Sequence, residues 1–176
     1  MRKKYLEYTP DELSLYDIRQ AQLEDAPGIE TLHAVNVHYI ILHCTATRCT
    51  THYRPEDLIR DHEARGFAAA GYHFLVRKNG NICQFRRTDE KGAHCNGHNW
   101  NSIGIAYEGG LNQEGQPDDT MTQSQLYSMR LLIRNISYDF PNIVVRGHRD
   151  FNPDKACPCF DAKQRFQKCT YEPSFI

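Results

Sequence analysis

The chain has 176 residues, of which 40% are hydrophobic and 24% are charged, and its formal net charge is −1. This length can bury the core of one domain, and so balanced a charge gives no indication of a nucleic-acid partner. No apolar run reaches the roughly 20 residues that a membrane-spanning helix needs, so we expect no membrane insertion. We predict a folded monomer.

The chain begins with "MRKKYLEYTPDELSLYD", which is basic at its start but lacks the apolar stretch of a signal peptide. As given, the chain is therefore predicted to be cytoplasmic. Its seven cysteines are an odd number, which favours reduced thiols over a secreted disulfide framework. A signal trimmed from a longer precursor is the alternative that the composition leaves open.

A helix is predicted over residues 9–23. Thr9 is a typical N-cap, Pro10 suits the first helical position, and Glu12 completes a capping box. The segment that follows, "EDAPGIETLHAVN", has the composition of a linker. We therefore predict an N-terminal helical extension, helix plus linker, over residues 1–35, and a main domain over residues 36–176.

Strands and helices alternate through the main domain. Strands are predicted at "VHYIILHCTAT", "SIGIAYEGG" and "NIVVRGH", and a hairpin is predicted at "GYHFLVRKNGNICQFR", which turns at Asn79-Gly80. Helices are predicted at "RPEDLIRDHEARGF", "TQSQLYSMRLLIRNISYDFP" and, in a shorter form, "CFDAKQRF". This alternation predicts a single α/β domain with a mixed central β-sheet flanked by helices.

Two of the nine histidines, His43 and His148, each stand where a predicted strand enters a loop. Ligands gather beyond the carboxyl ends of strands in open α/β sheets, so these two side chains can meet. Cys157 lies in the loop after His148 and can reach the same place. Two imidazoles and one thiolate would hold zinc and leave a fourth position for water, as catalytic zinc sites do. The alternatives are ordinary core or surface histidines and a packing cysteine.

Other metal patterns are incomplete. His62 begins a segment similar to HExxH, but Gly66 occupies the position of the second histidine. No C-x-x-C pair is present in the sequence. Cys44 adjoins His43, but adjacent strand residues face opposite sides of a sheet, so we expect Cys44 to be a packing thiol.

Four segments in order, "ILHCTAT", "GYHFLVRKNGNI", "GAHCNGHNWNSIGIAYEGG" and "RGHRDFNPDKACPCFD", resemble the zinc-dependent N-acetylmuramoyl-L-alanine amidases. These are phage-type, lysozyme-like amidases, and peptidoglycan recognition proteins are their relatives. The resemblance extends from about Val37 to Phe166, and four motifs in order are far more specific than any one of them. It implies zinc-dependent hydrolysis of the amide bond between N-acetylmuramic acid and L-alanine, in peptidoglycan or a muropeptide.

Residue by residue, the resemblance implies that His43, His148 and Cys157 bind Zn²⁺. It also implies catalytic roles for Tyr72 in "GYHF" and for Lys155, where many relatives carry threonine, so that Lys155 indicates the phage-type branch. The Lys155 ammonium would stabilise the oxyanion that develops on the carbonyl oxygen. Tyr72 would donate a hydrogen bond to that oxygen or position the water.

Substrate contact is predicted for His94, Asn99 and Trp100, because "GAHCNGHNWNS" lies where relatives build the wall of the groove. The alternative is that asparagine and glycine only shape this loop and that Trp100 is a core residue.

Three features depart from the family pattern. Cys159 lies two residues after Cys157 and could compete for the metal, although the pattern puts the ligand before the proline. Animal recognition proteins usually have a disulfide near the first histidine, but Cys44 and Cys49 do not clearly reproduce it, so we predict no bridge there. The first 35 residues match no pattern that we can place.

Two other functions stay open at this point. A non-catalytic module would bind peptidoglycan without cutting it, although relatives that only bind typically lack the metal cysteine. A zinc peptidase would cut within the stem peptide with the same metal. A cytoplasmic chain also needs a route to its substrate, for which we expect a phage-type pore, a trimmed precursor, or a role in recycling imported wall fragments.

Overall fold

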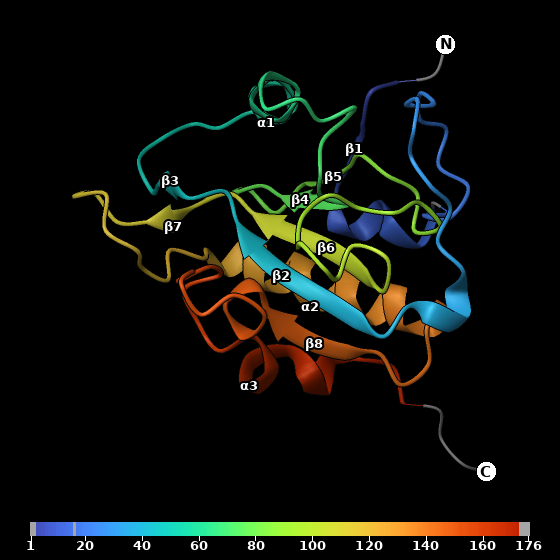
Figure 1. The fold of residues 1–176 in the computed structure, drawn as a ribbon. Coiled ribbons are helices and arrows are strands. Elements are labelled where there is room, and N and C mark those ends of the chain that lie inside the picture. Colours follow the sequence, from blue (N-terminus) through green and yellow to red (C-terminus); the bar gives the residue numbers. More distant parts are fainter. Residues whose placement is uncertain (1–2, 16, 173–176) are drawn as a thin grey trace.

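The structure is a computed structural model that describes residues 3–15 and 17–172 (Figure 1). Its elements in chain order are β1 (Leu6–Tyr8), a 3-10 helix (Pro10–Leu15), a 3-10 helix (Ala34–Asn36), β2 (Tyr39–Cys44), β3 (Thr47–Arg48), α1 (Pro55–Ala64), β4 (Phe74–Val76), β5 (Ile82–Gln84), β6 (Ser102–Tyr107), β7 (Gly110–Leu111), α2 (Gln123–Asp139), β8 (Val144–Gly147), a 3-10 helix (His148–Asp150), α3 (Ala162–Phe166) and a 3-10 helix (Gln167–Cys169). None of the helices within these described ranges is both long and apolar enough to span a membrane.

A six-stranded sheet with the order β1-β5-β4-β6-β2-β8 forms the centre of the molecule. Strands β4, β6, β2 and β8 run parallel to one another, whereas β5 is antiparallel to both β4 and β1. The sheet is therefore mixed, and the predicted α/β class is confirmed. Strands β3 and β7 form a separate two-stranded pair beyond the end of β2.

Helices α1 and α2 cover opposite faces of this sheet (Figure 1). The apolar stripe of α2, which includes Met129 and Ile133, packs against Ile40 and Leu42 of β2. On the other face, Leu58 of α1 packs with residues of β4 and β6. Because side chains alternate along a strand, the residue after Leu42 faces away from α2 and toward the α1 side of the sheet.

Local sequence signals mark the ends of several elements. The hydroxyl of Thr122 accepts a hydrogen bond from the Gln125 backbone N–H, and the Gln125 side chain accepts one from the Thr122 N–H. This capping box starts α2 where the sequence predicts it. The hairpin between β4 and β5 turns at Gly80, whose φ of +90° is a conformation that glycine adopts without strain.

The N-terminal segment differs from the prediction. Thr9 and Glu12 do form hydrogen bonds with each other, but the helix that they begin is a 3-10 helix that ends at Leu15 rather than at residue 23. Residue 16 of that predicted helix lies outside the described residues. A strand, β1, was not predicted and pairs with β5. Beyond Leu15 the backbone forms other contacts, because the Ile18 carbonyl accepts from the Gln84 side chain and Leu23 forms a bridge with Lys3, so this segment does not continue the helix.

The segment before residue 36 is also part of the main core. Tyr8, Leu13, Ile18 and Leu32 are all buried in the same cluster as α2 and the central strands. The 3-10 helix Pro10–Leu15 lies directly against α2. The division at residue 35 stays a prediction, and this packing indicates that the segment stabilises the sheet.

Replacing Leu13, which is 3% exposed, by alanine should therefore lower the free energy of unfolding by about 2–5 kcal/mol, the usual cost of a cavity in a core. Val35, which is 83% exposed, is the matched control in the same segment, and Val35→Ala should change stability by less than about 0.5 kcal/mol. Denaturant unfolding of both variants measures this. Equal stabilities would mean that the segment does not stabilise the domain.

Candidate metal centre

Two adjacent parallel strands bring His43 and His148 together. In the register of β2 and β8, Leu42 lies opposite Gly147, so the next residue on each strand is a histidine. The two imidazole rings are 4.7 Å apart, centroid to centroid. His43 is 1% exposed, and His148 is partly buried at the start of the 3-10 helix His148–Asp150. The predicted meeting of these two side chains is confirmed.

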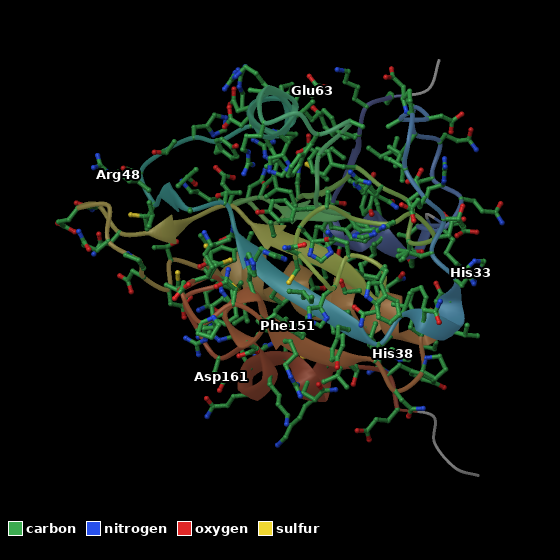
Figure 2. The ribbon with its side chains drawn as sticks, in the orientation of Figure 1. His33, His38, Arg48, Glu63, Phe151 and Asp161 are labelled. Carbon is green, nitrogen blue, oxygen red and sulfur yellow. The ribbon has the colours of Figure 1, made fainter. Side chains whose placement is uncertain are left out.

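Backbone contacts hold the loop that returns Cys157 to this place. The Arg149 N–H donates to the Cys157 carbonyl at 2.8 Å, and the Tyr107 hydroxyl donates to the Pro158 carbonyl at 2.9 Å. Gly147 leaves room for this loop, because a Cβ there would lie 2.7 Å from Cδ of Pro158. Phe151, in the same loop, lies beside β2, and its ring is 5.2 Å from that of Tyr39 (Figure 2).

One nitrogen each from His43 and His148 and the sulfur of Cys157 lie within 4.8 Å of one another. Among the described residues this is a group of donors that can hold a metal ion. The backbone N–H of Cys44 donates to the Cys157 sulfur at 3.2 Å, which fixes the position of that side chain. The Cys159 sulfur points elsewhere and donates to the Gly110 carbonyl.

Burial keeps the imidazoles of this cluster neutral. It lowers the pKa of His43 well below its ordinary value, and the neighbouring His148 lowers it further. Burial also lowers the pKa of His148, with a smaller contribution from the positive charge of Lys155. Only a neutral imidazole has a lone pair for a metal, so these environments suit metal ligands.

The other cysteines do not add donors to the cluster. Cys44 is buried in the core, as expected for a packing thiol, and its contact with the Cys157 side chain raises its pKa to about 12. All seven cysteines are free thiols in the structure, including Cys49.

A cavity of about 310 Å³ opens beside the cluster. Tyr72 and Lys155, the two predicted catalytic residues, both line it, and the Tyr72 ring is 5.0 Å from that of His43. Burial raises the pKa of Tyr72, so its hydroxyl stays protonated and can donate a hydrogen bond. The described lining residues include the cations Lys155 and Arg65 but no aspartate or glutamate, which favours an anionic ligand.

Three lining residues were not singled out as site residues from the sequence. Arg65 follows α1, Tyr53 precedes it, and His62 lies within it. The Nδ1 atom of His62 accepts a hydrogen bond from the Gly71 N–H at 2.7 Å. Arg65 and Tyr53 belong to no motif found in the sequence, and His62 stands only in an incomplete HExxH pattern. The packing of α1 over the ends of the strands brings all three to the cavity.

The residues predicted to contact substrate lie in different environments. His94 is buried and contributes to the lining of the cavity, and its Nδ1 is 2.9 Å from Nε2 of His43. The Asn99 side-chain oxygen accepts hydrogen bonds from the N–H groups of His94 and Cys95 and so shapes the loop. Trp100 is 50% exposed and is not a core residue. Neither Asn99 nor Trp100 lines the cavity, and substrate contact by the three residues stays a prediction.

The fold and this donor cluster define an α/β protein with a candidate metal centre that opens into a cavity. A family model described as N-acetylmuramoyl-L-alanine amidase matches residues 33–160, and the chain belongs to this family.

Known proteins similar to the chain include both phage and animal members. The endolysin of Klebsiella phage KP32 is 33% identical over 129 residues, which cover 73% of this chain and 85% of that protein. A peptidoglycan-recognition protein of Drosophila melanogaster is 32% identical over 70% of this chain and 69% of its own length. Among solved structures, N-acetylmuramoyl-L-alanine amidase LysC from Clostridium intestinale URNW has a TM-score of 0.64 and 29% identity, covering 76% of this chain and 82% of its own.

The buried side chain of His73, near the candidate metal centre, makes the free energy of unfolding depend on pH. His73 is 0% exposed; its Nδ1 accepts from the Gly104 N–H and its Nε2 donates to the Glu90 carbonyl, so folding requires the neutral ring. Burial lowers the pKa of His73 to about 3 from its ordinary 6.5. Below pH 6.5 the unfolded chain therefore binds a proton at His73 that the folded chain does not bind. The stabilisation from His73 is complete above pH 6.5 and is lost as the pH falls toward 3.

The stability advantage of the wild type over His73→Gln should accordingly shrink by about 2 kcal/mol between pH 7.5 and pH 5. Denaturant unfolding of both proteins, with a chelator present so that metal does not contribute, gives this difference at each pH. His33→Gln, which replaces an exposed histidine outside the core, is the control variant. A difference between the wild type and His73→Gln that stays constant with pH would contradict the prediction.

Proposed function

We propose that the protein is a zinc-dependent N-acetylmuramoyl-L-alanine amidase that cuts the amide bond between N-acetylmuramic acid and L-alanine in peptidoglycan. The observation that carries this proposal is the cluster of His43, His148 and Cys157 beside a cavity, in a chain of the amidase family. Related chains named endolysin and amidase support the activity.

The donor set fits zinc. Two neutral imidazoles and a thiolate are ligands that zinc prefers, and three protein ligands leave the fourth position of a tetrahedral site open. His43, His148 and Cys157 would hold the ion, and the cavity lies on the side from which substrate can approach. When bound there, zinc would supply a water with a pKa of about 7 and a Lewis acid for the carbonyl group.

The remaining chemistry falls to side chains of the cavity. Lys155 carries its positive charge at the mouth of the cavity, where it would stabilise the negative charge that develops on the carbonyl oxygen. The protonated Tyr72 hydroxyl would donate a hydrogen bond to the same oxygen or orient the water. Arg65 adds a second positive charge, which would attract the carboxylates of a stem peptide.

Digestion of purified peptidoglycan tests the activity directly. Free stem peptides that begin with L-alanine should appear, should be lost when a chelator removes the metal, and should return when zinc is added. Mass analysis of the released fragments identifies the bond. Cleavage between two amino acids would instead identify a peptidase, and binding without cleavage, in a sample shown to contain zinc, would identify a recognition module.

Two variants should separate binding of the metal from turnover. Cys157→Ala removes one of three ligands, so both the bound zinc and the activity should be lost. Lys155→Ala should keep one zinc per chain but lose about 10²–10³-fold in kcat, the usual cost of removing an oxyanion-stabilising group. Metal content by atomic spectroscopy and kcat on a muropeptide measure the two effects. The surface variant Lys163→Ala, outside the cavity, is the control; full activity in Lys155→Ala would exclude Lys155 from the mechanism.

The extension over residues 1–35 and the route to the wall belong to the same proposal. We infer that the extension packs as part of the amidase fold and is not a separate binding unit, because its buried residues share the main core. An anionic wall fragment would reach the centre through the cationic mouth of the cavity, whether the chain leaves the cell through a pore or acts on imported fragments.

A further inference from the structure

We propose that His94 is a positioning residue that fixes the tautomer of His43, so that the Nδ1 atom of His43 is the one offered to the metal. This inference rests on the metal centre proposed above and gives His94 a role different from the substrate contact predicted from the sequence. It follows from a series of three hydrogen bonds. In each of them, the chemistry of the groups decides which atom is the donor and which is the acceptor.

The series begins at a carbonyl group, which can only accept. The Ser102 hydroxyl donates its single proton to the His98 carbonyl at 2.6 Å. The same hydroxyl oxygen lies 3.3 Å from Nε2 of His94, so Nε2 of His94 must be the donor in that contact. A neutral imidazole carries one proton, and Nδ1 of His94 is therefore left as an acceptor.

The series ends at the candidate metal ligand. Nδ1 of His94 lies 2.9 Å from Nε2 of His43, and because Nδ1 is an acceptor, Nε2 of His43 must carry the proton. The unprotonated nitrogen of His43 is then Nδ1, which alone has a free lone pair. Partners of this kind fix the tautomer and the ring orientation of metal-bound histidines in general.

Two glycines make the space in which His94 lies. A Cβ on Gly104 of β6 would lie 2.5 Å from Cγ and Cδ2 of the His94 ring, and a Cβ on Gly92 would lie 2.5 Å from Cδ2. Asn99 holds the backbone on either side by accepting from the N–H groups of His94 and Cys95. The segment "GAHCNGHNWNSIG" therefore encloses one ring, with both ring nitrogens bonded inside the protein.

His94 does not touch the atoms that would react. It is 9% exposed and contributes to the lining of the cavity, but both of its ring nitrogens are engaged inside the protein, Nδ1 with His43 and Nε2 with Ser102. Its removal would leave the three donors in place but would free the His43 ring to rotate or to change its tautomer. We therefore expect its loss to weaken metal binding rather than substrate binding.

The tautomers can be read directly. Long-range ¹H–¹⁵N correlation spectra of the full-length chain, recorded with and without zinc, report which ring nitrogen of each histidine carries the proton. The expected result is a proton on Nε2 in both His43 and His94, assigned with the variants His43→Gln and His94→Gln. A proton on Nδ1 of His94 would overturn the proposal, and this readout is independent of whether the protein cuts peptidoglycan.

Zinc affinity, measured by competition with a chromophoric chelator, tests the consequence. His94→Leu removes both hydrogen bonds and should weaken zinc binding about 10- to 100-fold. His94→Gln keeps an acceptor and a donor and should recover part of that loss. Ser102→Ala should cause a smaller loss in the same direction. Ser128→Ala is the matched control, since this buried serine also donates to a carbonyl at 2.6 Å but on the α2 side of the sheet; it should bind zinc like the wild type.

The outcomes separate this inference from the proposed function. A wild-type chain that binds no zinc would refute the proposed metal centre, while the tautomers would still be readable in the metal-free protein. A wild type that binds zinc, together with unchanged affinity in both His94→Gln and Ser102→Ala, would refute the positioning role alone. Ser102→Ala removes only one oxygen atom, so it carries the test if His94→Leu fails to fold.

Discussion

The parallel pairing of β2 with β8 is the constraint on which the candidate centre depends. Pairing Leu42 with Gly147 places the next two residues, His43 and His148, side by side at the same end of the sheet. A slip of one residue would turn His43 into the core under α2, because side chains alternate between the two faces of a strand. Apolar burial of Ile40 and Leu42 thus fixes the register and, through it, the position of both imidazoles.

A buried histidine in such a sheet needs hydrogen-bond partners. Leaving its N–H unpaired would cost about 1–3 kcal/mol, a large part of the stability of a small domain. In this protein His94 forms the hydrogen bond with His43, and Ser102 forms one with the other ring nitrogen of His94. The Ser102 hydroxyl in turn donates to the His98 carbonyl, where the series of hydrogen bonds ends. The glycines at positions 92 and 104 belong to the same solution, since a larger residue at either position would collide with the His94 ring.

Much of this architecture follows from local sequence patterns. Runs of β-branched residues predict β2 and β8, the segment "TQSQLYSMRLLIRNISYDFP" predicts α2, and the turn at Asn79-Gly80 predicts the hairpin; all three predictions agree with the structure. The capping signal at Thr9 predicts a start but not a length, and the helix ends at Leu15 because Ile18 and Leu23 bond to Gln84 and Lys3 instead. A capping motif reflects interactions between residues close in sequence, whereas the end of that helix depends on contacts with residues far along the chain.

The burial of His94 could not be predicted from the sequence for a similar reason. In the sequence, "GAHCNGHNWNS" suggests a surface loop, because glycine and asparagine are typical of loops. The informative signal was that two positions are both glycine: Gly92, two residues before the histidine, and Gly104 in the following strand. The His94 ring lies so close to the backbone at each position that a side chain there would collide with it.

The cavity and the metal donors share one wall. Helix α1 and the segments that flank it form part of the lining, and the loop after β8 contributes both Cys157 and Lys155. Loss of the cysteine alone would break the donor set but leave the walls and the positive charges of Lys155 and Arg65 in place. In this chain the three donors therefore lie together at the cavity, and their position depends on the β2–β8 register as much as on the loop that carries Cys157.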